Sequence, residues 1–255
     1  GRMKFFWVFH SKNIKQLSLI IVAAFFTAGL LYVERADLTV FSTPDGPQAF
    51  YKAEIDEPRV ALTFNISWGE HRLGPILDIL EEKQVDHATF FISASWAERY
   101  PELVEQIVDR GHSIGSHGYQ YKNYTSMDDE EVRKDINRSR HVIESITGKR
   151  PTLLRPPNGD FDKRILTIAD AAGFSIIHWS IDSNDYQNPG VEKIVDTVVS
   201  NAKPGDIILF HASDSVKQTD RALPIIIDQL REKGFSFSSI DDFITSTESS
   251  YEEIK

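Results

Sequence analysis

Cysteine is absent from this chain of 255 residues, and no acidic residue occurs before Glu34. The first absence excludes a disulfide framework, and for an exported domain it fits a Gram-positive cell surface. The second leaves the amino-terminal segment with basic charges only, among them Lys4, Lys12 and Lys15. Over the whole chain basic residues are the minority, 28 against 38 acidic ones, and the formal net charge is -10. That balance disfavours nucleic acids and anionic membrane surfaces as partners.

Charge of either sign is absent between Leu17 and Val33, where the sequence is LSLIIVAAFFTAGLLYV. This run of roughly 17 residues lies at the lower limit for crossing a bilayer. With basic residues before it, it predicts a signal anchor at 17–33, with residues 1–16 in the cytoplasm and the remaining chain outside the membrane. A cleaved signal peptide is the alternative, although no clear Ala-x-Ala site follows the run. Gly1 and Arg2, which precede Met3, are interpreted as an expression scar.

The rest of the chain divides into three parts. Residues 34–58 predict a linker with short strands around the turn STPDGP, and residues 59–244 predict a regularly patterned domain. Residues 245–255 form a polar tail that we expect to be frayed.

Within the domain, strand-like apolar runs alternate with helical periods. The runs begin at Val60, Ala88, His112, Thr152, Ser175, Asp206 and Phe235. The helical periods cover 75–85, 101–110, 128–147, 162–172, 191–202 and 224–233. Such alternation predicts an α/β fold with a parallel sheet. About seven units in this length favour an incomplete (β/α) barrel of about seven parallel strands, with an open doubly wound sheet as the alternative.

Polar residues follow the carboxyl ends of the predicted strands. They are Asn65, His117 with Tyr121, Arg155 with Asn158, Asp182 with Asp185, and His211. In a barrel these strand ends meet at one rim, which is where the chemistry of such folds is found. The first strand ends in LTFNISWGE, so an amide and an aliphatic side chain stand where many hydrolases have acidic residues.

The motifs VALTF, HSIGSHGYQY, LLRPPNG, IDSNDY and IILFH make the chain similar to a known family over residues 59–244. They resemble the polysaccharide deacetylases of the NodB-homology class, carbohydrate esterase family four, and within it the PdaB-type sporulation branch. The resemblance implies a NodB-like incomplete (β/α) barrel. It also implies a hydrolase that removes acetyl groups from N-acetylated sugars with a divalent metal, usually zinc.

Carried over residue by residue, the resemblance assigns the general base to Asn65 and the metal ligands to Ile66, His117 and Tyr121. Asn65 cannot take up a proton at neutral pH, and Ile66 has no lone pair. A zinc site needs at least three protein ligands, and of these positions only His117 carries a usual one. We therefore expect no bound metal cofactor and no metal-dependent deacetylation.

Other positions keep the residues that the resemblance implies. It assigns His211 as the catalytic acid, Asp185 as the residue that orients it, and Arg155 as the partner of the base position. It also implies substrate-binding roles for three residues, Asn158, Tyr186 and Tyr121. We expect Arg155 to pair with Asp182 or Asp185.

Two tryptophans and several histidines have no motif context. Trp68 and Trp179 are expected to pack within the barrel or its loops, and no role is assigned to the remaining histidines, His10, His87, His112, His141 and His178.

These observations predict a glycan-binding protein of the spore or cell-wall peptidoglycan, anchored in the membrane. One alternative is an active hydrolase with non-standard metal ligation by His117 and by Glu70 or His71. The other is a protein-interaction scaffold on the membrane surface.

Overall fold

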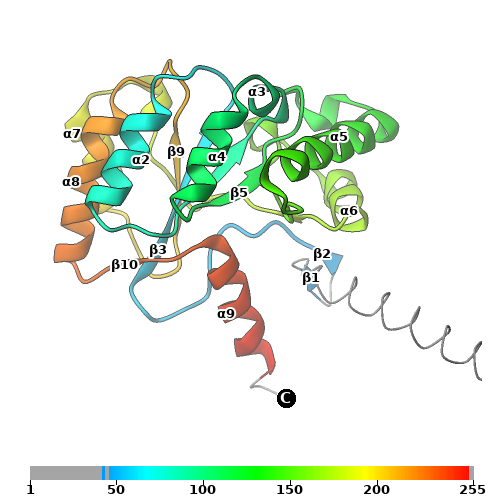
Figure 1. Cartoon of the computed structure of the whole chain (residues 1–255). Helices are drawn as coiled ribbons and strands as arrows, with labels where there is room; N and C mark the ends of the chain where they lie inside the picture. The colour runs from blue at the N-terminus through cyan, green and yellow to red at the C-terminus, as the bar shows by residue number, and fades with distance from the viewer. Residues whose placement is uncertain (1–41, 44–45, 253–255) are drawn as a thin grey trace, which may run out of the picture. The chain divides into compact units, whose positions relative to one another are not determined.

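In the computed structural model, which describes residues 42–43 and 46–252, the central strand is β3 (Arg59–Ile66) (Figure 1). Its side chains alternate between two faces, as the two-residue period of a strand requires. The even-numbered residues Val60 to Ile66 belong to an apolar cluster with side chains of α2 (Leu73–Glu82) and α8 (Thr219–Glu232). The odd-numbered residues therefore point into the barrel, and this alternation decides which side chains of β3 can reach a site there.

The strands form one parallel sheet that is curled into an incomplete barrel. Its order is β7 (Ser175–Ile176), β6 (Leu153–Leu154), β5 (Ser113–Ser116), β4 (Thr89–Ile92), β3, β9 (Ile207–His211) and β8 (Ile181–Asp182). The short β10 (Ser236–Phe237) pairs with the first two residues of β3. The predicted barrel of about seven parallel strands is confirmed, and the open doubly wound alternative is not adopted.

The segment before β3 pairs with residues that flank two strands of the sheet, β7 and β9. Phe50 pairs with Ile177, which follows β7, and Lys52 pairs with Asp206, which precedes β9. The backbone N–H of Phe50 donates to the carbonyl of Ile176 at 2.8 Å. Before this segment, β1 (Ser42–Thr43) and β2 (Gly46–Pro47) form a short antiparallel hairpin. The segment thus connects the residues after β7 with those before β9.

Helices connect most of the strands. Besides α2 and α8 they are α3 (Ala94–Arg99), α4 (Pro101–Asp109), α5 (Asp129–Thr147), α6 (Lys163–Ala171), α7 (Val191–Val199) and α9 (Ile240–Glu252). The short α3 was not predicted. The predicted start of α8 at Pro224 is wrong, because the helix begins at Thr219 and contains Pro224.

The predicted frayed tail from residue 245 is wrong for the described residues, because α9 continues to Glu252. Ile240, Phe243 and Ile244 are buried in one apolar cluster with Ala61 and Ile207, close to the beginnings of β3 and β9. The helix therefore covers the end of the barrel at which the strands begin. The apolar residues that α9 contributes to this cluster lie before residue 245, so the polar composition of the tail alone does not reveal that it continues a helix.

The predicted signal anchor at 17–33 and the predicted cytoplasmic segment 1–16 lie outside the described residues. The same holds for residues 34–41 of the predicted linker. Among the residues that are described, no helix is both long and apolar enough to cross a bilayer.

Acidification should destabilise the protein through His112, which is 6% exposed and precedes β5. Its Nδ1 accepts the backbone N–H of Ala88 at 3.2 Å, and burial lowers its pKa from 6.5 to about 4. Between these values the unfolded chain binds more protons, so the free energy of unfolding should fall as the pH falls from 6.5 to about 4. The slope from this one group is at most about 1.4 kcal/mol per pH unit. Urea unfolding at several pH values would measure it.

The matched comparison is between His112→Gln and His141→Gln, since His141 is exposed. The first variant should have a smaller slope than the wild type in this pH range, and the second should keep the wild-type slope. Equal slopes for all three proteins would show that His112 is not the group responsible.

Candidate ligand-binding cleft

A cleft of about 520 Å³ lies at the carboxyl ends of the strands. It contains six of the residues that the sequence analysis singled out, and they are Asn65, Tyr121, Asn158, Asp182, Tyr186 and His211. The remaining lining residues are Ser67, Trp68, Gly159, Trp179, Leu209, Ser213, Ser215 and Val216. A cleft of this size, with polar groups among aromatic ones, is typical of a ligand-binding site.

Arg155 lies beneath this cleft and is completely buried. Its Nη1 donates to Asn65 Oδ1 and to Thr63 Oγ1, both at 2.9 Å. Its Nε and Nη2 donate to the carbonyls of Ile177 and His178 at 3.3 and 2.9 Å. The predicted ion pair of Arg155 with Asp182 or Asp185 is wrong, because none of its partners among the described residues is a carboxylate within 4.0 Å. Burial lowers its pKa to about 9, and the charge of Asp182 opposes that shift.

Asn65 and Ile66 point in opposite directions from neighbouring positions of β3. Asn65 is 5% exposed and lines the cleft, whereas Ile66 is fully buried in the apolar cluster that packs against the helices. The side chain of Ile66 therefore does not reach the cleft. A carboxylate introduced at position 66 would have to leave an apolar environment in order to reach it.

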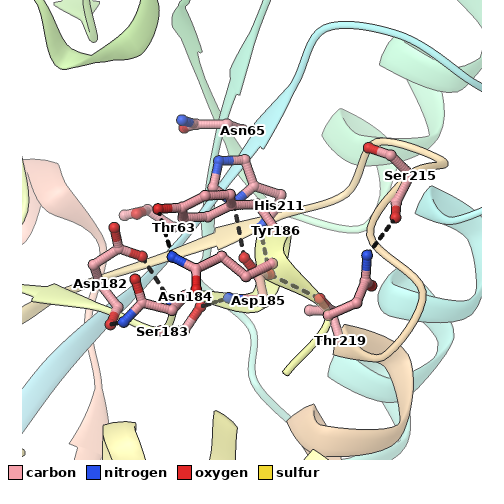
Figure 2. A network of polar contacts seen from close by, with 12 residues as sticks. Thr63, Asn65, Asp182, Ser183, Asn184, Asp185, Tyr186, His211, Ser215 and Thr219 are labelled. Atoms are coloured by element: carbon pink, nitrogen blue, oxygen red, sulfur yellow. Dashed lines mark hydrogen bonds and ion pairs between the residues drawn. The ribbon is translucent and has the colours of Figure 1, made fainter. Parts of the chain in front are cut away.

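His211 of β9, next to Asn65 of β3, forms a hydrogen-bonded pair with Asp185 (Figure 2). His211 Nδ1 lies 2.8 Å from Asp185 Oδ1, and Asp185 Oδ2 accepts both the backbone N–H of His211 and the hydroxyl of Thr219. Since Asp185 is fully buried and acts as an acceptor in each contact, the proton of a neutral His211 is on Nδ1. Nε2 is then free to accept a hydrogen bond, beside the ring of Tyr186 at 5.5 Å between centroids.

His117 does not line the cleft, because Tyr121 covers it. The two rings lie 5.1 Å apart between centroids, and His117 is fully buried. Its Nδ1 donates to the carbonyl of Arg155 at 2.6 Å, while its Nε2 has no hydrogen-bond partner among the described residues. Burial lowers the pKa of His117 to about 3, and the charge of Arg155 acts in the same direction.

Tyr121 is held in place by the side chain of Asn158. Its hydroxyl donates to Asn158 Oδ1 at 2.8 Å, and Asn158 Nδ2 donates to Asn123 Oδ1 at 2.6 Å. Both Tyr121 and Asn158 have left-handed backbone conformations, with φ of 51° and 58°. These contacts hold the Tyr121 ring over His117 in the place where the resemblance implies a metal ligand.

These residues do not fit a zinc ion. Among the described residues, no group of three or more His, Asp or Glu side chains could hold a metal. Among the described residues, His117 Nε2 has no hydrogen-bond partner and belongs to no such group. Glu70 and His71 are exposed, and their backbone N–H groups bind Asp214. No catalytic step through a metal follows from this arrangement.

The packing role predicted for Trp68 is wrong, whereas Trp179 packs against the buried cluster that contains Phe91 and Ile177, as predicted. Trp68 is 53% exposed and lines the cleft together with Tyr186, which is 49% exposed. Trp179 also lines the cleft, and its ring stacks on that of His178 at 3.8 Å. The sequence signal that could have placed Trp68 in the cleft is its position, three residues after Asn65 at the end of a strand. Exposed aromatic rings around a cleft provide flat surfaces on which sugar rings can stack.

A loop of residues 212–218 is attached to both walls of the cleft. On one side, Ser213 Oγ accepts the backbone N–H of Ser67, and Asp214 accepts the N–H groups of residues 70–72 at the start of α2. On the other side, the N–H of Lys217 donates to Asn188 Oδ1, and Gln218 Oε1 accepts the N–H of Gly190. The loop therefore fixes the wall that carries Trp68 relative to the wall that carries Tyr186.

Comparison with known proteins places this cleft in a family. Residues 52–177 match the family model described as polysaccharide deacetylase. A peptidoglycan-N-acetylglucosamine deacetylase of Bacillus cereus is 34% identical over 192 residues, which cover 74% of this chain and 89% of that protein. The uncharacterized protein YlxY of Bacillus subtilis is 29% identical over 79% of this chain, and the match spans 62% of its own length.

A solved structure gives the same result. A protein of Bacillus anthracis that is described as a CE4 family pseudoenzyme has a TM-score of 0.74 and 29% sequence identity, with 78% of this chain and 69% of that chain covered. A mutant of the same protein is described as having restored enzymatic activity. The curled parallel barrel, the rim residues and these matches agree, and this chain belongs to the polysaccharide deacetylase family, carbohydrate esterase family 4.

Proposed function

We propose that this protein binds N-acetylated glycans, such as peptidoglycan, in the cleft without metal-dependent deacetylation. The observation that supports the proposal most strongly is that the cleft has aromatic walls and a His211–Asp185 pair, while residues 42–43 and 46–252 contain no metal-ligand set. An amide bond hydrolyses very slowly without an activated nucleophile, and neither Asn65 nor Ile66 supplies a base or a metal ligand. The B. anthracis protein described as a pseudoenzyme is a precedent within the family.

We further propose that the segment 17–33 anchors the protein in the membrane, with the cleft facing the cell wall or the envelope of a developing spore. The uncharged run and the basic residues before it support this placement. Protease protection of the full chain in inverted vesicles tests it. An accessible cleft domain on the cytoplasmic side would contradict it.

Binding of N-acetylglucosamine oligomers to the full chain in detergent should be measurable by calorimetry and unaffected by a chelator. Tyr186→Ala should weaken that binding roughly tenfold, since an aromatic contact of this kind contributes about 1 kcal/mol or somewhat more. Tyr51→Ala is the matched control, because Tyr51 is an exposed aromatic residue outside the cleft.

Two results of this experiment would contradict the proposal. Release of acetate that stops on addition of chelator would establish an active hydrolase with other metal ligands. A protein-interaction scaffold on the membrane would be favoured if the protein does not bind glycans and if the Tyr186→Ala and His211→Ala variants function in cells as the wild type does.

A further inference from the structure

The orientation of the Asn65 amide is fixed by Arg155. A guanidinium group has hydrogen-bond donors and no acceptor, so the atom of Asn65 that faces it must be the carbonyl oxygen. That oxygen lies 2.9 Å from Arg155 Nη1. The amide nitrogen of Asn65 therefore points to the other side, toward the cleft that Asn65 lines. An aspartate at this position would present an acceptor to the cleft, whereas asparagine presents a donor.

The positive charge of Arg155, which lies below Asn65, also favours a carbonyl oxygen in the cleft over an ammonium group. Arg155 is completely buried, and within the described part of the chain its hydrogen bonds all go to neutral oxygen atoms, those of Thr63, Asn65, Ile177 and His178. A buried positive charge without a carboxylate in contact attracts a carbonyl oxygen and repels an ammonium group in the cleft above it. Asp182 is the only carboxylate among the lining residues of this cleft, and the backbone N–H of Asn184 donates to it.

A hydrogen-bond acceptor stands next to this donor. Asn65 and His211 are register partners on the adjacent parallel strands β3 and β9, and Figure 2 shows their side chains close together. With its Nδ1 proton directed to Asp185, neutral His211 offers Nε2 as an acceptor. The floor of the cleft thus combines an amide donor with an imidazole acceptor, which suits a carbonyl oxygen beside an N–H or hydroxyl group.

We propose that Asn65 determines specificity by donating a hydrogen bond to the carbonyl oxygen of an N-acetyl group, so that the cleft discriminates N-acetylated sugars from free amino sugars. This inference rests on the proposed glycan binding and adds the chemical feature that is recognised. The protonated amino group of a deacetylated sugar is an ammonium group, which has hydrogen-bond donors and no acceptor. Such a sugar would lose the hydrogen bond that Asn65 donates to a carbonyl oxygen, and the charge of Arg155 would repel it. A protein with this preference would bind intact glycan and release it after deacetylation by another enzyme.

Calorimetry with the full chain tests this with two probes of equal length, a tetramer of N-acetylglucosamine and a tetramer of glucosamine. The wild type should bind the acetylated tetramer at least about tenfold more tightly, since a site that hydrogen-bonds a group rejects the analogue lacking it. Asn65→Asp should abolish or reverse this preference. Asn137→Asp, the same charge change at an exposed position of α5, should leave it unchanged. Thermal unfolding of each variant establishes that it is folded.

The inference is overturned if the wild type binds both tetramers equally or prefers the amine. If the wild type prefers the amine, the variant Asp182→Asn identifies the cause. Loss of the preference in this variant would show that the carboxylate of Asp182 recognises the amine. If Asn65→Asp does not fold, Asn65→Ala is used in its place. It should lose affinity for the acetylated tetramer without gaining affinity for the amine, and an unchanged preference would overturn the inference. Absence of binding to either tetramer would overturn the proposed function as well.

Discussion

Replacing Arg155 by alanine should lower the free energy of unfolding by about 3–5 kcal/mol, because the substitution leaves a cavity and unpaired oxygen atoms in the middle of the barrel. The guanidinium donates to four oxygen atoms and lies 4.1 Å from the centre of the Phe91 ring. Loss of the desolvated charge offsets part of that cost. Urea unfolding at pH 7 measures the difference.

Two further variants make this result interpretable. Arg150→Ala removes the same kind of side chain from an exposed position five residues earlier, and it should change stability by no more than about 0.5 kcal/mol. Arg155→Met keeps most of the volume and removes only the hydrogen bonds, so it should lie between the other two. If Arg155→Ala is as stable as the wild type, the polar network around Asn65 does not contribute to the stability of the barrel.

The largest gain in zinc affinity and in deacetylase activity is expected from the triple variant Asn65→Asp, Ile66→Asp, Tyr121→His. Together with His117, the changes at positions 66 and 121 restore the three metal ligands that the family resemblance implies, and the change at position 65 restores the base. Zinc should then bind with micromolar or tighter affinity, and acetate should be released from N-acetylglucosamine oligomers in a reaction that a chelator stops. A left-handed backbone such as that of Tyr121 suits histidine better than most residues.

The buried position of Ile66 gives this variant a second measurable property. Without metal, a carboxylate at position 66 lies in or near the apolar cluster, so the variant should be less stable than the wild type. Zinc should raise its melting temperature, since it binds the folded state only. Asn65→Asp alone is the control and should show no zinc effect. If the triple variant folds but binds no zinc, then the assignment of Asn65 and Ile66 to the family motif is wrong.

The barrel could be predicted because its signals are local. The alternation of Val60 to Ile66, followed by a polar turn, identifies both the strand and its end without knowledge of the other strands. The same applies to His211 at the end of β9. The family resemblance then indicated which of these strand-end residues belong to one site. The structure brings six of the candidate site residues to one cleft.

The features that escaped prediction depend on contacts between distant segments. Arg155 was assigned a carboxylate partner because buried charges usually have one. Neutral oxygen atoms from β3 and from the segment after β7 surround it, and no local pattern reveals that. A packing role was expected for Trp68, since nothing in its neighbourhood shows that Asp214, far along the chain, binds the backbone of the residues that follow it.

The loop 212–218 has a thermodynamic consequence for the cleft. Because its hydrogen bonds hold the loops of both walls, the conformational entropy of these loops is lost when the chain folds and not when a ligand arrives. Free and occupied protein should then share nearly the same backbone. Differences in affinity between ligands would arise from the contacts each one makes, and not from the ordering of the protein around it.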